Sequence, residues 1–127
     1  MNLLLDTHAF LWWLQDNRNL GRESRAAIVD PDNRVFVSAA TAWEIAVKRS
    51  SGRLEAPGDV GEWIETSGFD ALPIEVAHAV ASAELPKHHA DPFDRLLIAQ
   101  AVLEGFVLMA RDDEIDKYDV EILDAHS

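Results

Sequence analysis

Asn2-Leu3-Leu4-Leu5-Asp6 decides the fold, because an unbroken apolar run ends there on a carboxylate. Consecutive leucines without polar alternation are typical of a short strand buried on both faces, as in parallel sheets. Four further segments have the composition of strands: 34–37, 69–72, 106–109 and 120–123, the last at an edge of the sheet. Helices are expected between them, at 9–15, 22–29, 39–49, 60–66, 75–84 and 91–104. Strands that alternate with helices predict one α/β domain over residues 1–127, with a mainly parallel sheet.

Four acidic residues adjoin apolar runs, where a soluble domain has little structural reason to place a charge: Asp6, Glu44, Asp94 and Asp112. A carboxylate beside buried apolar surface is costly unless a cation pairs with it. Lys and Arg are too few at matching positions, so we expect a divalent cation to be the partner. Sites in open parallel sheets form beyond the carboxyl ends of the strands, and Asp6 and Asp112 directly follow strands. We therefore predict that the four acids converge at this edge and hydrolyse phosphodiester bonds.

The predicted site offers oxygen ligands, because the chain has no cysteine and no clear pair of histidines. Oxygen ligands favour Mg²⁺ or Mn²⁺ over Zn²⁺. We expect Asp6 and Asp94 to bind the ion directly, and Glu44 and Asp112 to complete the site through water or a second ion. In the absence of metal, repulsion between these like charges is expected to raise their pKa values. No organic cofactor is expected.

Each acid also has an ordinary structural interpretation. Asp6 could cap the helix that follows it. Asp91 could cap the last long helix, with Asp94 as a first-turn acid beside it, and Asp112 lies in a charged turn. Glu44 is the hardest to explain in this way, because apolar residues four before and three after it share its helical face. A buried or half-buried carboxylate is expected at this position.

The histidines and the pair Trp12-Trp13 have less specific interpretations. No two histidines have metal-ligand spacing on one helix, so solvated or core-edge positions are expected for them. His8 is the exception, because it lies two residues after Asp6. Adjacent helical residues point about 100° apart, so both tryptophans are buried only if two surfaces cover them. Core packing is favoured for both, with a dimer or partner contact as the alternative.

Composition limits the possible functions. A formal net charge of −12 argues against a protein that coats nucleic acid, since such affinity comes from Lys and Arg. It is compatible with an enzyme that holds one phosphodiester on metal. The absence of cysteine rules out disulfides and thiolate metal sites. The sequence has no basic leader and no apolar run of roughly 20 residues, so a cytoplasmic protein without a membrane span is expected.

Motifs at four places carry a family resemblance: Leu4-Leu5-Asp6-Thr7-His8, Ser-Ala-Ala-Thr-Ala-Trp-Glu-Ile-Ala at 38–46, His-Ala-Asp-Pro-Phe-Asp-Arg-Leu-Leu-Ile-Ala-Gln-Ala at 89–101, and Arg111-Asp112. Over essentially its whole length the chain resembles PIN-domain ribonucleases, and among them the VapC-type toxins of bacterial toxin–antitoxin pairs. The resemblance implies a PIN-like three-layer α/β/α domain with a five-stranded parallel sheet. It also implies an Mg²⁺- or Mn²⁺-dependent endoribonuclease toxin that cleaves tRNA or another structured RNA. A cognate VapB-type antitoxin and a homodimer are implied as partners.

The family's four acids fall on residues of this chain in the same order: Asp6, Glu44, Asp94 and Asp112. Asp91 is carried over only as a helix cap. The chain departs from many relatives at Ala110, where a Thr or Ser hydroxyl would otherwise be available to orient a carboxylate or water. An antitoxin is expected to place an Arg or Lys among the four acids. Its apolar helix is expected to cover surface that includes Trp12 or Trp13.

Three other classes of protein are compatible with parts of the pattern. A phosphatase of the haloacid dehalogenase type also begins with a strand ending in Asp, but it needs a second Asp where this chain has His8. A receiver domain needs an acidic pair after the first strand, whereas Asp6 stands alone there. The strongest alternative is a non-catalytic PIN-like interaction module, which the presence of all four acids disfavours.

Overall fold

The sheet has five parallel strands in the order β3-β2-β1-β4-β5 in the computed structural model, which describes residues 1–56, 58–88, 90–111 and 113–127. The strands are Asn2–Leu5 (β1), Arg34–Ser38 (β2), Asp70–Leu72 (β3), Val107–Ala110 (β4) and Ile122–Asp124 (β5). The helices are Thr7–Leu14 (α1), Arg22–Val29 (α2), Ala39–Ser50 (α3), Val60–Thr66 (α4), Val76–Glu84 (α5) and Pro92–Glu104 (α6), with a 3₁₀ helix at Asp113–Lys117 (η1). The predicted fold class is confirmed.

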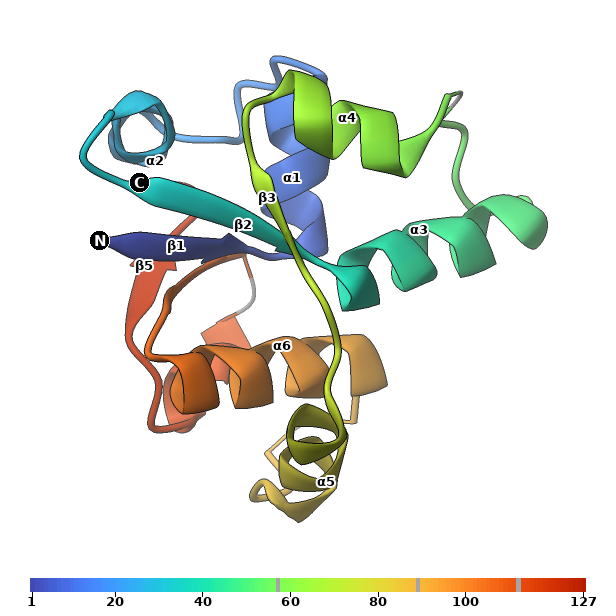
Figure 1. Cartoon of the computed structure of the whole chain (residues 1–127), viewed down its shortest axis with the longest axis vertical. Coiled ribbons are helices and arrows are strands. Elements are labelled where there is room, and N and C mark those ends of the chain that lie inside the picture. The colour runs from blue at the N-terminus through green and yellow to red at the C-terminus, as the bar shows by residue number, and fades with distance from the viewer. Residues whose placement is uncertain (57, 89, 112) are drawn as a thin grey trace.

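Helices cover both faces of the sheet, which gives the expected three layers (Figure 1). One face packs against α1, α2 and α4, and its apolar cluster contains Leu3, Leu5 and Phe10. The other face packs against α6, and its cluster contains Leu4 and Leu97, with α5 lying on the outer side of α6. Alternate leucines of β1 therefore enter opposite clusters, as expected for a strand buried on both faces.

Local signals set most of the helix boundaries. The Ser38 hydroxyl accepts a hydrogen bond from the Ala40 amide and begins α3. The Asp91 carboxylate caps α6 and Pro92 occupies its first turn. Gly105 ends α6 in the left-handed conformation, with φ of 73°. These caps were predicted from the sequence and are confirmed.

Some boundaries differ from the prediction. Helix α1 begins at Thr7 rather than Ala9, because the Asp6 side chain already caps it. Strand β5 begins at Ile122 rather than Val120, and η1 was not predicted. Among the residues that the structure describes, no helix has the length and apolar character needed to cross a bilayer.

Candidate active site at the carboxyl edge of the sheet

The order of the strands places the candidate site. The chain builds the sheet outward from β1 through β2 to β3, and then returns to the other side of β1 to form β4 and β5. The switch point therefore lies between β1 and β4, where parallel α/β sheets form their sites. Asp6 directly follows β1 at this point, and its backbone amide donates to the Met109 carbonyl of β4 at 2.8 Å.

Asp6 joins the two strands that flank the switch point. One carboxylate oxygen accepts from the Ala9 amide at 2.7 Å and caps α1. The other accepts from the Arg111 amide, just beyond β4, at 3.0 Å. The side chain is buried, with 2% of the residue exposed. The helix-cap interpretation of Asp6 is thus confirmed, but a cap on an exposed helix end would need neither this burial nor the bond to Arg111.

Burial raises the pKa of Asp6 from its ordinary 3.8 to about 6, against two backbone hydrogen bonds and the Arg111 charge, which lower it. The Glu44 charge raises the pKa as well, but it is the smallest of these effects. The expected rise in pKa is therefore present at Asp6, and the expected repulsion from Glu44 contributes to it, but only as a minor cause. Desolvation dominates rather than repulsion between acids.

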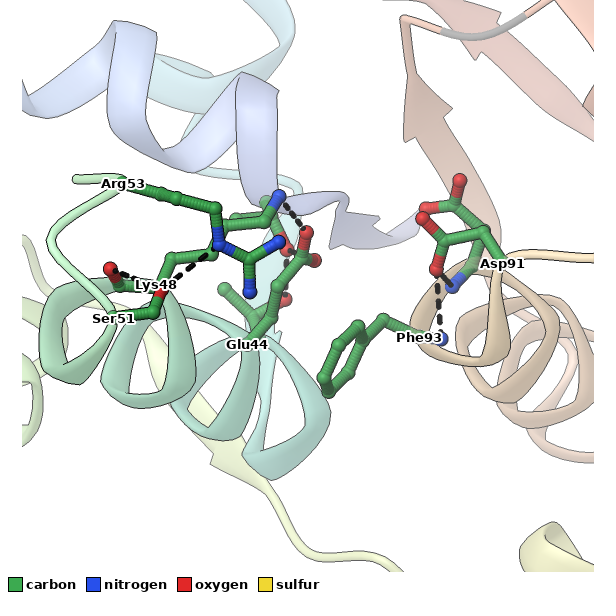
Figure 2. Close-up of polar contacts among 9 residues, drawn as sticks. Glu44, Lys48, Ser51, Arg53, Asp91 and Phe93 are labelled. Carbon is green, nitrogen blue, oxygen red and sulfur yellow. Dashed lines mark hydrogen bonds and ion pairs between the residues drawn. The ribbon is translucent and has the colours of Figure 1, made fainter.

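Glu44 lies on α3 and points into the same edge of the sheet. It is 3% exposed, so the predicted buried carboxylate is confirmed. One carboxylate oxygen accepts from the Thr7 hydroxyl at 2.6 Å, and the Thr41 hydroxyl oxygen lies 3.4 Å from that of Thr7. The other oxygen contacts the Lys48 ammonium at 2.5 Å (Figure 2). Glu44 is thus held by residues of both α1 and α3.

Lys48 partly corrects the expectation that Lys and Arg are too few at matching positions, because it pairs with one of the four acids. It lies four residues after Glu44 on the same helix, and this spacing places the two side chains on one face. The i,i+4 pattern was available in the sequence and would have identified the ion pair. Asp6 differs from Glu44, because within the described part of the chain it forms no ion pair.

Asp94 lies in the first turn of α6, where its amide donates to the Asp91 carboxylate at 3.1 Å. Asp94 is half-buried and Asp91 is exposed. The start of α6 packs against α3 through Phe93 and Trp43, whose rings are 4.8 Å apart in an edge-to-face arrangement. Figure 2 shows Phe93 between the Glu44 side of α3 and Asp91. The beginning of α6 therefore adjoins the edge that holds Asp6 and Glu44.

Asp112, the fourth predicted acid, lies outside the described residues. Within the described ranges, no group of three or more acidic, His or Cys side chains is arranged to hold a metal ion. Convergence of all four acids on one ion therefore stays a prediction. The donor chemistry fits a hard cation, because Asp6 is a buried carboxylate without a cationic side chain bound to it.

His8 lies beside this site, as its position after Asp6 indicated. It is half-buried on the first turn of α1. Burial lowers the pKa of His8, with contributions from the Arg111 and Lys48 charges, while the Glu44 charge opposes them. The imidazole is consequently neutral at neutral pH, and it does not add a positive charge to the site.

His78 lies in the core, whereas a solvated or core-edge position is expected for it from the sequence. His78 is 1% exposed, its Nδ1 accepts from the Glu75 amide at 3.0 Å, and its Nε2 lies 2.8 Å from the Glu104 carboxylate. The tryptophan pair also packs in the core: Trp12 is buried and Trp13 is partly buried against Phe69. The core interpretation of Trp12-Trp13 is confirmed.

Comparisons with known proteins agree with this geometry. The PIN domain family model matches residues 3–121. Ribonuclease VapC22 of Mycobacterium tuberculosis is 27% identical over 113 residues, which cover 87% of this chain and 86% of that protein. A chain of the crystal structure of DNA-bound VapBC from Salmonella typhimurium has a TM-score of 0.69 at 15% identity, with 98% of both chains covered.

A chain of VapBC2 from Rickettsia felis, bound to a promoter DNA fragment, has a TM-score of 0.68 at 11% identity and covers 97% of this chain and 98% of that one. At such identities the structural likeness concerns the fold. The sheet carries a buried acid at its switch point, and one family model matches residues 3–121. This chain therefore belongs to the PIN domain family.

Proposed function

We propose that this protein is an Mg²⁺- or Mn²⁺-dependent endoribonuclease that cleaves RNA phosphodiester bonds. The observation that carries the proposal is Asp6, a carboxylate buried at the switch point that forms no ion pair within the described part of the chain. The likeness to a protein named a ribonuclease, over 87% of this chain, supports the same activity. The −12 charge is compatible with it, because a bound divalent ion offsets acidic charge at the site.

Asp6 and Asp94 are the proposed direct ligands, and Glu44 and Asp112 complete the site through water or a second ion. When bound, Mg²⁺ or Mn²⁺ would supply an acidified water and offset negative charge on the phosphate. The amides of Ala9 and Arg111 hold the Asp6 carboxylate in one orientation. Such fixed orientation is what an ion with strict octahedral geometry requires of its ligands.

Glu44 has a different environment from Asp6. Its two oxygens already contact the Thr7 hydroxyl and the Lys48 ammonium. An oxygen bound to these partners is better placed to orient a water molecule than to bind an ion directly. This arrangement supports the proposed division of roles between Asp6 and Glu44.

The proposed substrate class is tRNA or another structured RNA. The experiment incubates purified protein with total cellular RNA in Mn²⁺ or in EDTA and maps the new 5′ ends by sequencing. Cleavage at a limited set of sites in Mn²⁺, lost in EDTA, is the expected result. Intact RNA in both conditions would favour the non-catalytic interaction module instead.

We further propose that a VapB-type antitoxin neutralises the enzyme, since several solved structures with this fold are VapBC complexes. A hollow of about 320 Å³ between α1 and α4 offers an apolar surface for such a partner. Its lining residues are Leu11, Leu14, Gln15, Glu55, Ala56 and Trp63. Trp12 is buried and Trp13 is partly buried, so Trp13 is the better placed of the two for the expected antitoxin contact. An Arg or Lys of the partner would pair with the acids of the site.

Homodimerisation is also proposed, as the resemblance implies. Helix α5 and the segment just before it expose apolar side chains: Ile74 is 37% exposed, Val76 82% and Val80 52%. Apolar surface on neighbouring turns of one helix is typical of an interaction site. Sedimentation of the wild type and of Val76→Lys tests the proposal, and a dimer that the substitution leaves intact would exclude α5 from the interface.

A further inference from the structure

A hollow of about 250 Å³ lies next to the candidate site, between α1 and the segment that follows α3. Its lining residues are Thr7, His8, Leu11, Trp12, Gln15, Lys48, Arg53 and Leu54. Thr7 and Lys48 belong both to this hollow and to the contacts of Glu44. A ligand that occupies it would therefore lie directly beside the acids.

The hollow brings together two cations in a strongly acidic protein. Lys48 lines it while its ammonium contacts Glu44, and Arg53 lies over α3 on the same side (Figure 2). Other arginines of the chain are used differently. Arg25 and Arg34 form ion pairs with Asp16 and Asp70.

The Arg53 guanidinium uses only part of its hydrogen-bonding capacity within the described protein. Its Nε donates to the Ser51 hydroxyl at 2.8 Å, which fixes the direction of the side chain. Within the described ranges, no protein acceptor contacts its two terminal nitrogens, and the residue is exposed. A guanidinium with two free parallel donors matches the oxygens of a phosphate, which it binds bidentately.

We propose that this hollow binds the phosphate and ribose of the RNA nucleotide next to the scissile bond, with Arg53 as the phosphate ligand. The inference rests on the proposed function, since it places one RNA strand across the acidic edge and the hollow together. The volume is below the range of about 300–1,000 Å³ typical of drug-sized ligands, and it suits a sugar phosphate better than a whole nucleotide chain.

The acids beside the hollow explain why such a subsite is needed. Asp6, Glu44 and Asp94 repel the phosphates on either side of the bond that is cut. A cation one nucleotide away counters this repulsion without neutralising Asp6 or Asp94. Lys48 is paired with Glu44 and offsets that acid where the hollow meets the acidic edge, while Arg53 supplies the directional contact to the phosphate.

The experiment compares wild type, Arg53→Ala, Arg53→Lys and a control, Arg34→Ala. Arg34 is an exposed arginine at the start of β2, and therefore at the opposite end of the strands from the site. Binding of a 5′-fluorescein-labelled single-stranded RNA of 12 nucleotides is measured by anisotropy in EDTA over a series of KCl concentrations. Cleavage of total RNA in Mn²⁺ is measured on the same preparations.

Arg53→Ala is expected to weaken RNA binding about tenfold, the change that follows from losing one charge-assisted contact. The slope of log K against log salt should become shallower by about 0.7, as for one lost phosphate contact on a single strand. Arg53→Lys should restore the slope but only part of the affinity, because an ammonium lacks the bidentate fork. Arg34→Ala should behave as wild type.

Equal affinities and slopes for Arg53→Ala and Arg34→Ala would overturn the subsite. If the wild type still cleaves RNA in that case, the proposed function stands without it. If the wild type does not cleave RNA but Arg53→Ala alone weakens binding, the hollow is an RNA phosphate site, and its place next to a scissile bond falls together with the proposed function. Loss of binding and cleavage in every variant including Arg34→Ala would contradict the assignment to Arg53.

Discussion

Replacing Asp6 with Asn should make the stability of the protein less sensitive to pH. Burial raises the Asp6 pKa from 3.8 to about 6. Between these two pH values the folded state therefore holds a proton that the unfolded state has already released. Stability therefore falls as pH rises through this window. The full cost of ionising Asp6 in the folded protein is about 3 kcal/mol, of which about 2 kcal/mol develops between pH 4 and pH 7.5.

Asn cannot ionise, so Asp6→Asn removes this cost at high pH. Its side chain retains one carbonyl oxygen and loses the second acceptor, which leaves either the Ala9 or the Arg111 amide without its bond, at a cost of about 1–3 kcal/mol. This second effect is the same at both pH values. The difference in unfolding free energy between variant and wild type should thus shift in favour of the variant by about 2 kcal/mol from pH 4 to pH 7.5.

Urea unfolding in EDTA at the two pH values measures this shift. Asp59→Asn is the matched control, because Asp59 is an exposed N-cap of α4 where the same exchange relieves no desolvation. Asp59→Asn should show no comparable gain in stability relative to wild type from pH 4 to pH 7.5. If Asp6→Asn also shows no shift, burial does not disfavour the charged form of Asp6, and the argument for a missing cation fails.

Three further outcomes follow from the contacts of the site. Lys48→Met should lower the free energy of unfolding by about 1–3 kcal/mol, because it leaves the buried Glu44 carboxylate without its cation. A double-mutant cycle with Glu44→Gln should show coupling between the two substitutions. Additive effects on the free energy of unfolding would contradict the ion pair. Mn²⁺ should raise the melting temperature of the wild type but not of Asp6→Asn, because an ion bound through Asp6 stabilises only the protein that has this carboxylate. Equal shifts in melting temperature for both proteins would place the ion elsewhere. The association rate with a basic antitoxin segment should fall as the salt concentration rises, because the −12 charge attracts the segment at long range. Stopped-flow mixing measures this rate. A rate that is independent of salt would exclude electrostatic steering.

The sequence predicted elements whose signals are local. The leucines of β1, the Ser38 cap, the Asp91-Pro92 start of α6 and Gly105 each act within a few residues, and the structure confirms them. The burial of Glu44 was also predictable, because the apolar residues that share its helical face are close in sequence.

Features that depend on distant segments were not predicted. The bond from the Arg111 amide to Asp6 joins residues that are 105 positions apart, and no local pattern indicates it. The main cause of the raised Asp6 pKa is not a local signal either, since desolvation depends on how α1, β1 and β4 pack together. Lys48 is a different case. Its i,i+4 spacing from Glu44 is a local signal, and it predicts the ion pair without any information on distant segments.

The role of Asp6 in catalysis is the central claim, and cleavage of one mapped RNA site in Mn²⁺ tests it most directly. Wild type, Asp6→Asn and Asp59→Asn are compared at equal folded concentration, verified by circular dichroism. We predict that Asp59→Asn cleaves as wild type and that Asp6→Asn is slower by about a hundredfold or more. Cleavage by Asp6→Asn at the wild-type rate would contradict the account.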